Sequence, residues 1–239
     1  MPCILAIETS AHIGAVAILG GERCEFLLAA QSVRDDQKLS AWVLPAIERV
    51  IADTGLTHTA IDAIAFGAGP GSFTGVRTAC ATAQSLAYAW KRPLITVDSL
   101  AALAETSSAS SMCVVLDARM REVFSASFTR RADGELAQTA ATTVSGPDAV
   151  VVPADSELIG SGAKLLPAPQ NFALAATAHA ESNWAHGIAR IAARKLARGE
   201  ITDPMRAEPI YVRNNVALTE AERQQARLVN QHLTIEAVT

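Results

Sequence analysis

The sequence predicts an α/β fold built from two related domains, and three observations lead to this prediction. A pattern of strand, acidic turn, strand, tight turn and strand occurs twice, about 110 residues apart. Segments with helical periodicity lie between the two copies and after the second. A glycine-rich loop joins a buried strand to one of these helices. Because strands and helices alternate, each half is expected to contain a sheet covered by helices.

The first copy of the pattern lies close to the N-terminus. Residues 3–7 (CILAI) form a continuous apolar run, which is typical of a strand buried on both faces. A polar turn, Glu8–Ser10, separates this run from a second strand at 14–19. The Gly-Gly pair that follows indicates a hairpin, and a third strand is expected at 23–30.

The second copy repeats this order. Residues 112–116 (MCVVL) are apolar, and the turn Asp117–Arg119 carries an acid where the first copy has Glu8. A second strand is expected at 122–128, and an Asp-Gly turn leads to a third strand from residue 135. One three-stranded unit in each half favours an actin-like ATPase (ASKHA) fold with two duplicated domains, as in sugar kinases.

Apolar spacing and cap residues predict the elements between and after the copies. In order, they are a helix at 36–53, a strand at 61–66, a helix at 76–90, a strand at 94–97, a short helix capped by Asp98 or Ser99, and a helix at 181–199.

Domain boundaries follow from composition. A Ser-rich stretch at 105–111 is the best candidate for a linker between domains. We therefore expect an N-terminal domain at 1–106 that carries the partner-binding helices, a C-terminal domain at 107–215, and a polar C-terminal helix or tail at 216–239.

Composition and charge exclude several protein classes. The net charge is −4, whereas a protein that grips nucleic acid alone normally shows excess Lys and Arg. The four cysteines form no CxxC pair, which indicates reduced thiols rather than a disulfide framework or a zinc site. No stretch approaches the roughly 20 apolar residues that cross a bilayer. The chain is therefore expected to be cytoplasmic, without membrane association.

The segment 67–77 (GAGPGSFTGVR) is the most informative in the chain. Four glycines between a strand and a helix imply a sharp loop with close backbone approach, and Ser72 or Thr74 can cap the helix. A structural role in this loop is therefore assigned to five residues: Gly69, Gly71, Ser72, Thr74 and Gly75.

Three known loop motifs do not fit this segment. A Walker A loop requires a lysine, which is missing here. A dinucleotide-binding fingerprint would need glycine at position 72, where Ser72 stands. A nucleophile elbow would need glycines two positions before and after Ser72, and Pro70 and Thr74 occupy those positions.

The glycine-rich segment, together with the N-terminal LAIETS, resembles the TsaB family. Four further segments support the resemblance in family order and cover nearly the whole chain: LPAIERVIADTG at 44–55, LDARMREVFSASF at 116–128, IGSGAKLL at 159–166 and AEPIYVRN at 207–214.

The resemblance implies a function in tRNA modification. TsaB proteins are actin-like and related to TsaD, the catalytic subunit that transfers a threonylcarbamoyl group onto a tRNA adenosine. A TsaB-like chain is expected to be a non-catalytic subunit that binds TsaD, supports it together with the ATPase TsaE, and forms a homodimer in isolation. It is expected to meet tRNA only indirectly. The resemblance implies no intrinsic cofactor and leaves open ATP or ADP at the interface with TsaD.

The alternatives are a stand-alone glycoprotease-like metallopeptidase and an actin-like nucleotide-dependent enzyme. TsaD binds a metal with a His-x-x-x-His pair on a helix, which places two imidazoles on one face. The five histidines of this chain include no two that are four residues apart. We therefore predict no metal site and no catalytic residues.

In actin-like kinases an acidic turn in each half helps to hold metal-bound phosphates. The resemblance places seven residues close to such a nucleotide: Glu8, Thr9, Ser10, Asp117, Arg119, Gly160 and Gly162. The second turn lacks glycine and contains the bulky Arg119, so an independent ATPase cleft is predicted to be degraded. Arg119 either meets a phosphate held by a partner or pairs with a neighbouring acid such as Glu122.

The family uses two helices of the N-terminal domain to bind itself or TsaD. The candidate residues are Leu39, Trp42, Val43, Arg77, Cys80, Ala83 and Ala87. Small residues on helix 76–90 allow a neighbouring helix to approach closely, either from a partner or within the domain. Trp42 is interpreted as an exposed aromatic anchor or as a side chain folded onto its own domain.

Overall fold

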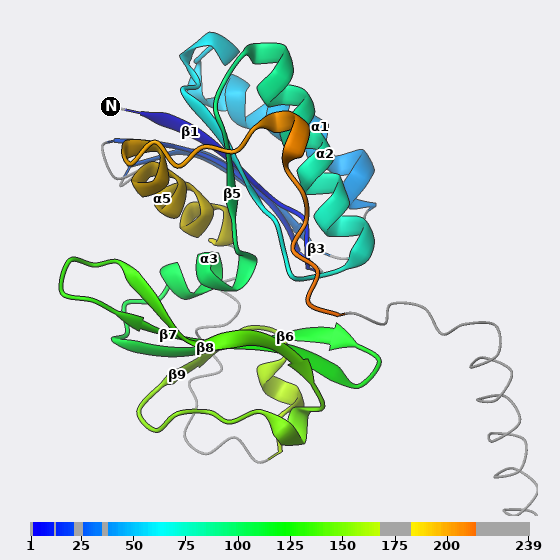
Figure 1. Ribbon diagram of the computed structural model, residues 1–239. Coiled ribbons are helices and arrows are strands. Elements are labelled where there is room, and N and C mark those ends of the chain that lie inside the picture. The colour runs from blue at the N-terminus through cyan, green and yellow to red at the C-terminus, as the bar shows by residue number, and fades with distance from the viewer. Residues whose placement is uncertain (1, 12, 22–25, 35–37, 168–182, 214–239) are drawn as a thin grey trace, which may run out of the picture.

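The computed structural model describes residues 2–11, 13–21, 26–34, 38–167 and 183–213, and two β-sheets form its framework (Figure 1). One sheet lies in each half of the chain, and a short helix, α3, lies between them. The predicted C-terminal helix or tail at 216–239 lies outside the described residues.

The first sheet has five strands in the order β3-β2-β1-β4-β5. Strand β2 runs antiparallel to its neighbours β1 and β3, whereas β4 and β5 continue the sheet in parallel with β1. All five strands expected from the apolar runs are present. Their bounds are β1 Cys3–Glu8, β2 Ile13–Gly20, β3 Phe26–Arg34, β4 Ala63–Gly67 and β5 Leu94–Val97.

The second sheet has four strands in the order β8-β7-β6-β9, and this order repeats β3-β2-β1-β4 of the first sheet. In both sheets an antiparallel meander lies on one side of the central strand and a parallel strand on the other. The predicted duplicated, actin-like architecture is therefore confirmed. The bounds are β6 Ser111–Arg119, β7 Glu122–Arg130, β8 Leu136–Ser145 and β9 Glu157–Ile159.

Helices cover both faces of the first sheet over its central strands, so β1, β2 and β4 are buried, whereas the edge strand β3 is largely exposed. In β1, Leu5 and Ile7 face the core under α1 and α2, whereas Ile4 and Ala6 face the core under α5 and α3. Figure 1 shows α1 and α2 on one side of this sheet and α5 on the other. The helices are α1 Leu39–Thr54, α2 Phe73–Trp90, α3 Ser99–Glu105 and α5 Trp184–Ala197. Short 3₁₀ turns are η1 His58–Ala60, η2 Pro147–Ala149, η3 Ala163–Leu165 and η4 Pro204–Arg206.

The helix ends follow the predicted signals. Gly55 ends α1 in the left-handed region, with φ 66°. Asp98 caps α3, since its carboxylate accepts a hydrogen bond of 2.8 Å from the Ala101 N–H. Ser72 caps α2 by accepting a hydrogen bond of 3.0 Å from the Gly75 N–H. Both predicted caps thus satisfy backbone donors that have no partner within the helix.

Helix α3 joins the two sheets. Its Leu100 and Leu103 belong to the same buried cluster as Met112 and Val114 of β6, so one apolar core continues across both domains. Glu105, the last residue of α3, is 5% exposed and pairs with two cations. Its carboxylate lies 2.9 Å from Arg194 of α5 and 3.4 Å from Arg130 of β7.

A segment at 198–213, which we call the strap, runs from the end of α5 along the first domain to the second (orange in Figure 1). Thr202 forms a bridge with Leu94 of β5, and the Ala207 carbonyl accepts a hydrogen bond of 3.0 Å from the Gln84 amide on α2. At its end, the Arg213 guanidinium contacts the Glu122 carboxylate of β7. The strap therefore links the two domains.

Both predicted acidic turns differ from expectation in their local structure. Glu8 ends β1 and, with Thr9 and Ser10, is fully buried rather than exposed in a polar turn. Strand β6 continues through Arg119, and the reversal occurs in a tight hairpin around Met120, where three consecutive residues have φ near 60°. The hairpin register, not an acidic turn, therefore determines where the chain reverses.

Candidate functional site

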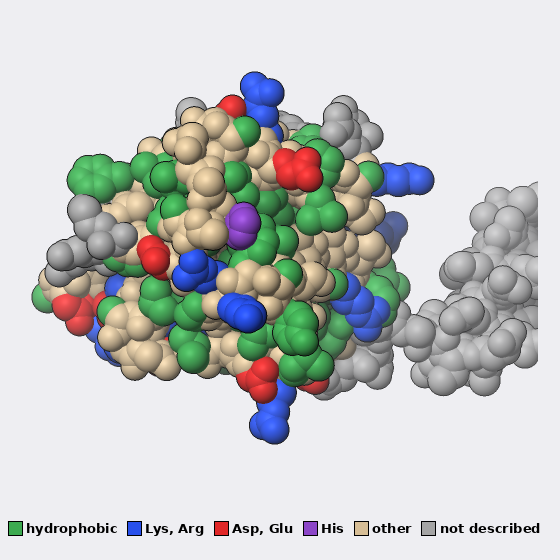
Figure 2. Space-filling view, turned by 90° about the horizontal axis from the view of Figure 1, so that it is seen from above, with side chains coloured by type: hydrophobic (Ala, Val, Ile, Leu, Met, Phe, Trp, Pro, Cys, Tyr) green, Lys and Arg blue, Asp and Glu red, His purple; other side chains and the backbone are tan. Residues whose placement is uncertain are grey.

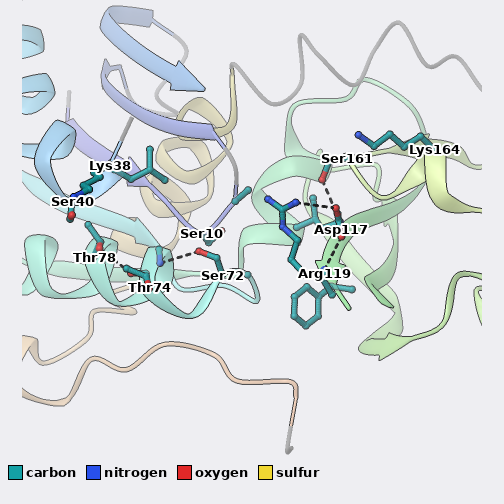
Figure 3. A pocket seen from close by; sticks show the side chains of 17 residues that line it. Ser10, Lys38, Ser40, Ser72, Thr74, Thr78, Asp117, Arg119, Ser161 and Lys164 are labelled. Atoms are coloured by element: carbon teal, nitrogen blue, oxygen red, sulfur yellow. Dashed lines mark hydrogen bonds and ion pairs between the residues drawn. The ribbon is translucent and has the colours of Figure 1, made fainter. Parts of the chain in front are cut away.

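A cleft with a volume of about 570 Å³ lies between the two domains. In Figure 3 the labelled residues of the first domain (Ser10, Lys38, Ser40, Ser72, Thr74 and Thr78) lie opposite those of the second (Asp117, Arg119, Ser161 and Lys164). Hydroxyl groups line much of the first-domain wall, and charged groups come from both walls. The cleft is therefore suited to a polar ligand.

The glycine-rich loop forms part of the first-domain wall because it packs directly on the end of β1. The Ser72 N–H donates to the Ser10 carbonyl at 2.6 Å, and the Thr9 hydroxyl donates to the Gly75 carbonyl at 2.8 Å. A Cβ on Gly75 would lie 1.9 Å from the Thr9 carbonyl oxygen, and one on Gly71 would lie 2.3 Å from that of Ser10. Only glycine fits at these two contacts.

Gly69 and Thr74 complete the residues assigned to this loop. Gly69 has a backbone φ of 99°, which residues other than glycine rarely adopt. Its N–H donates a hydrogen bond of 3.1 Å to the Ser99 hydroxyl. Thr74 is exposed and lines the cleft. Its carbonyl accepts a hydrogen bond of 2.9 Å from the Thr78 hydroxyl one helical turn later.

Glu8 lies behind the cleft wall rather than in it. Its carboxylate accepts hydrogen bonds from the Ser99 hydroxyl at 2.7 Å and from the Ser10 N–H. A Cβ at Gly67 would lie 1.9 Å from this carboxylate, so the neighbouring strand leaves room for it. Burial raises the pKa of Glu8, and the hydrogen bonds oppose that rise. Of the first predicted acidic turn, only Ser10 reaches the cleft lining.

The second-domain wall carries the second predicted group. The Asp117 carboxylate accepts a hydrogen bond of 2.7 Å from the Arg119 N–H and lies 3.8 Å from the Arg119 guanidinium. Glu122, the acid named as an expected partner of Arg119, contacts Arg213. The Asp117 N–H donates to the Ser161 hydroxyl at 3.3 Å, which holds the following loop against β6.

Gly160 and Gly162 have a packing role in that loop. Gly160 has φ 109°, and a Cβ there would lie 2.3 Å from the Val115 carbonyl oxygen. A Cβ on Gly162 would lie 2.7 Å from the Leu116 carbonyl carbon. Neither glycine lines the cleft, whereas Ser161 between them does.

Charge in the cleft differs in sign from the charge of the chain. Lys38, Arg119 and Lys164 line it, and Asp117 is the single carboxylate among the described lining residues. The chain as a whole has a net charge of −4. A cavity whose walls carry excess positive charge attracts anions even when the surrounding protein is acidic.

The residues predicted to bind a partner separate into two groups. Val43, Cys80, Ala83 and Ala87 are buried under the helices against the domain's own sheet, so the intramolecular interpretation holds for them. Arg77 is exposed on α2, where its guanidinium lies 3.4 Å from the centre of the Phe73 ring.

Leu39 and Trp42 are half-buried, because Gly14 of β2 leaves space for them. A Cβ at Gly14 would lie 2.7 Å from the Trp42 ring and 2.8 Å from the Leu39 side chain. Trp42 packs on the core beneath α1, so its ring is folded onto its own domain. Leu44, two residues later, is 52% exposed, although the helical spacing of apolar residues in this segment groups it with the core-facing positions.

The described part of the chain contains neither a cluster of metal ligands nor a membrane-spanning helix. Within residues 2–11, 13–21, 26–34, 38–167 and 183–213, no group of three or more His, Cys, Asp or Glu could hold a metal ion. No helix in these ranges has the length and apolar character needed to span a membrane.

In Figure 2, acidic and basic side chains are interspersed with apolar ones on the face shown.

Comparison with known proteins identifies the family. A family model described as TsaD, tRNA N6-adenosine threonylcarbamoyltransferase, matches residues 34–231. The tRNA threonylcarbamoyladenosine biosynthesis protein TsaB of Escherichia coli is 29% identical over 227 residues, which cover 90% of this chain and 96% of that protein. The protein of the same name from Haemophilus influenzae is 37% identical over 126 residues, and this match spans about half (51%) of each chain.

A solved structure supports the same assignment. YeaZ from Pseudomonas aeruginosa superposes with a TM-score of 0.73 at 29% identity, covering 88% of this chain and 100% of that one. The family model, the curated relatives and the shared fold agree. The chain therefore belongs to the TsaD family and, within it, to the TsaB (YeaZ) group.

Proposed function

We propose that this chain is a non-catalytic subunit for the synthesis of N6-threonylcarbamoyladenosine in tRNA. In this role it binds the catalytic subunit TsaD in the cytoplasm and supports it together with the ATPase TsaE. The observation that carries the proposal is the similarity to a protein named for this pathway over 96% of that protein's length. Contact with tRNA is indirect, since the chain has a net charge of −4.

The exposed faces of α1 and α2 support the partner-binding part of this proposal. On α2, Arg77, Ala81, Ser85 and Tyr88 are exposed at helical spacing, so small residues lie between a cation and an aromatic ring. Leu44 is exposed on α1, which packs beside α2. Small central residues allow a second helix to approach closely, and larger ones at the ends supply contact area. The same surface is proposed to form a homodimer when TsaD is absent.

The cleft supports a second part of the proposal, which concerns nucleotide. Its excess of cationic side chains suits the phosphates of ATP or ADP held at the interface with TsaD. Glu8 is buried behind the wall, so the first acidic turn offers no carboxylate to a metal-bound phosphate in this cleft. We therefore propose that the chain contributes to a shared nucleotide site and does not turn nucleotide over alone.

The test is the mass of the complex formed with TsaD and TsaE, measured by light scattering with and without ATP. A complex that contains this chain and TsaD supports the proposal, whereas no association under either condition refutes it. ATP hydrolysis by the isolated chain is the companion measurement. Robust turnover by the purified protein would favour an actin-like nucleotide-dependent enzyme, and protease activity lost on chelation would favour a metallopeptidase.

A further inference from the structure

A second cavity, of about 220 Å³, lies beside the interdomain cleft, and we call it the side groove. Three segments far apart in the sequence form its walls: the start of α2 with Phe73 and Val76, the β6–β7 hairpin with Met120, and the strap with Ile210 and Tyr211. The groove and the larger cleft share five lining residues, Gly71, Ser72, Ala118, Arg119 and Phe124, and most of the remaining groove walls are apolar.

Large apolar side chains converge at this groove while remaining exposed to solvent. Phe73 and Tyr211 are each 49% exposed, Met120 is 74% exposed and Ile210 is 37% exposed. The two rings lie 6.5 Å apart between centroids. Exposed apolar groups gathered around a concavity are typical of a binding surface, because leaving them in water is unfavourable.

The rim of the groove is cationic. Arg119 and Arg213 line it, and the described lining residues include no Asp or Glu. Arg77 extends over the Phe73 ring at 3.4 Å and lies 5.6 Å from the centre of the Tyr211 ring. Glu122 contacts Arg213 and Asp117 lies 3.8 Å from Arg119, both from outside the groove, so the charge of each lining arginine is partly balanced. The remaining charge complements an acidic ligand.

The groove is held in shape by the strap. The Ile210 N–H donates to the Ala68 carbonyl at 2.7 Å, at the start of the glycine-rich loop. The Arg213 guanidinium donates to the Ala118 carbonyl at 3.1 Å in the second domain. Because both ends of this short stretch are fixed, the exposed rings are already placed for contact and little ordering is needed on binding.

We propose that the side groove receives an apolar side chain from an acidic segment of the partner subunit, which extends the helical contact surface to the domain boundary. This inference rests on the proposed function, since TsaD is taken as the partner. The aliphatic groups of Val76, Ile210 and Val212 suit an apolar side chain. These aliphatic groups offer no hydrogen bonds to the polar edge of a nucleobase, which favours a protein segment, and RNA stacking on Phe73 and Tyr211 is a competing outcome of the test.

The experiment measures TsaD binding by titration calorimetry with the full chain. Phe73→Ala, Tyr211→Ala and Arg77→Glu are expected to weaken binding by about tenfold or more, as loss of central aromatic and arginine contacts does. Met205→Ala and Arg206→Glu are matched controls, because both side chains are highly exposed on the same strap and lie outside the groove. The effect of Arg77→Glu is expected to shrink at high salt. Thermal melting verifies that each variant is folded. Tyr211→Ala, on the strap, decides the matter if Phe73→Ala disturbs α2, because Arg77 also belongs to the proposed helical contact surface.

Each other outcome overturns a different statement. If the wild-type chain does not bind TsaD, the proposed function fails. If the wild-type chain binds and the groove variants bind equally well, the groove inference is wrong while the proposed function stands. The inference is also overturned if the groove variants lose affinity for tRNA rather than for TsaD. A chain ending at residue 213 whose TsaD binding no longer responds to the groove substitutions would point to the chain's own C-terminal segment as the occupant.

Discussion

Replacing Glu105 with Gln is expected to destabilise the protein far more than the loss of an exposed carboxylate such as that of Glu135. The Glu105 side chain is 5% exposed, and it lies 2.9 Å from Arg194 and 3.4 Å from Arg130. These partners come from α5 and β7, so the carboxylate joins both domains at the end of α3. Its removal leaves two partly buried guanidinium groups beside each other without their shared anion.

The magnitude follows from the burial of the three groups. Removing one partner of a buried ion pair costs about 3–5 kcal/mol. The arginine side chains are 20% and 22% exposed, so water can reach them and the lower end of that range applies. We expect a loss of about 3 kcal/mol, which corresponds to a fall in Tm of about 6–12 °C for a chain of this size.

The assay is urea unfolding at pH 7, followed by circular dichroism, with Glu135→Gln as the matched control. Glu135 pairs with Arg198 at 2.5 Å, but both side chains are partly exposed, so its loss is expected to cost under about 1 kcal/mol. Adding Arg194→Met to Glu105→Gln should recover part of the loss, because it removes one unpaired charge. If Glu105→Gln and Glu135→Gln unfold at the same urea concentration, the reasoning about the buried carboxylate is refuted.

Three further predictions concern the first domain. Burial raises the pKa of Glu8, so its contribution favours the folded state below the ordinary Glu pKa of about 4.3 and is lost as pH rises through the raised value. In urea unfolding, the free energy of unfolding of Glu8→Gln relative to that of wild type should therefore be more favourable at pH 7 than at pH 4. A difference that stays constant across this range would contradict the assignment. Gly75→Ala is expected to lower the free energy of unfolding by about 1–3 kcal/mol or more, since its Cβ would lie 1.9 Å from a backbone oxygen. The control Gly146→Ala meets open space and should be near neutral. Equal urea midpoints for the two variants would contradict this packing argument. Leu44→Glu should weaken association with TsaD at least about tenfold without lowering Tm. The control Val151→Glu, at an exposed site on the second domain, should leave this association unchanged. If Leu44→Glu binds TsaD as tightly as wild type by light scattering or calorimetry, α1 is not part of the proposed surface.

Sequence reasoning was most successful where structure depends on neighbouring residues. The apolar runs at 3–7 and 112–116 became the central strands of the two sheets, because a strand buried on both faces must be apolar throughout. The caps at Ser72 and Asp98 were recognisable because a short polar side chain binds the backbone N–H groups that directly follow it. The duplication was also recognisable, because each copy shows the same local order of apolar runs and turn residues.

Burial of the candidate site residues followed a different rule. Glu8 was expected near a nucleotide, but Ser99, far along the chain, donates to its carboxylate and draws it into the interior. Trp42 lies on its own sheet because Gly14 of β2 provides the space. The local pattern of polar and apolar residues could predict neither contact, because it indicates whether a position is buried but not which distant residue packs against it.

The sequence by itself determined the class of fold, its duplication, the glycine-rich loop and the family to which the chain is similar. The tertiary structure alone decided that Glu105 links three elements, that α5 returns to the first sheet, and that the strap brings Tyr211 beside Phe73. The physical reason is distance along the chain. Periodicity and capping act over a few residues, whereas ion pairs, close backbone contacts and grooves form between segments that only folding brings together.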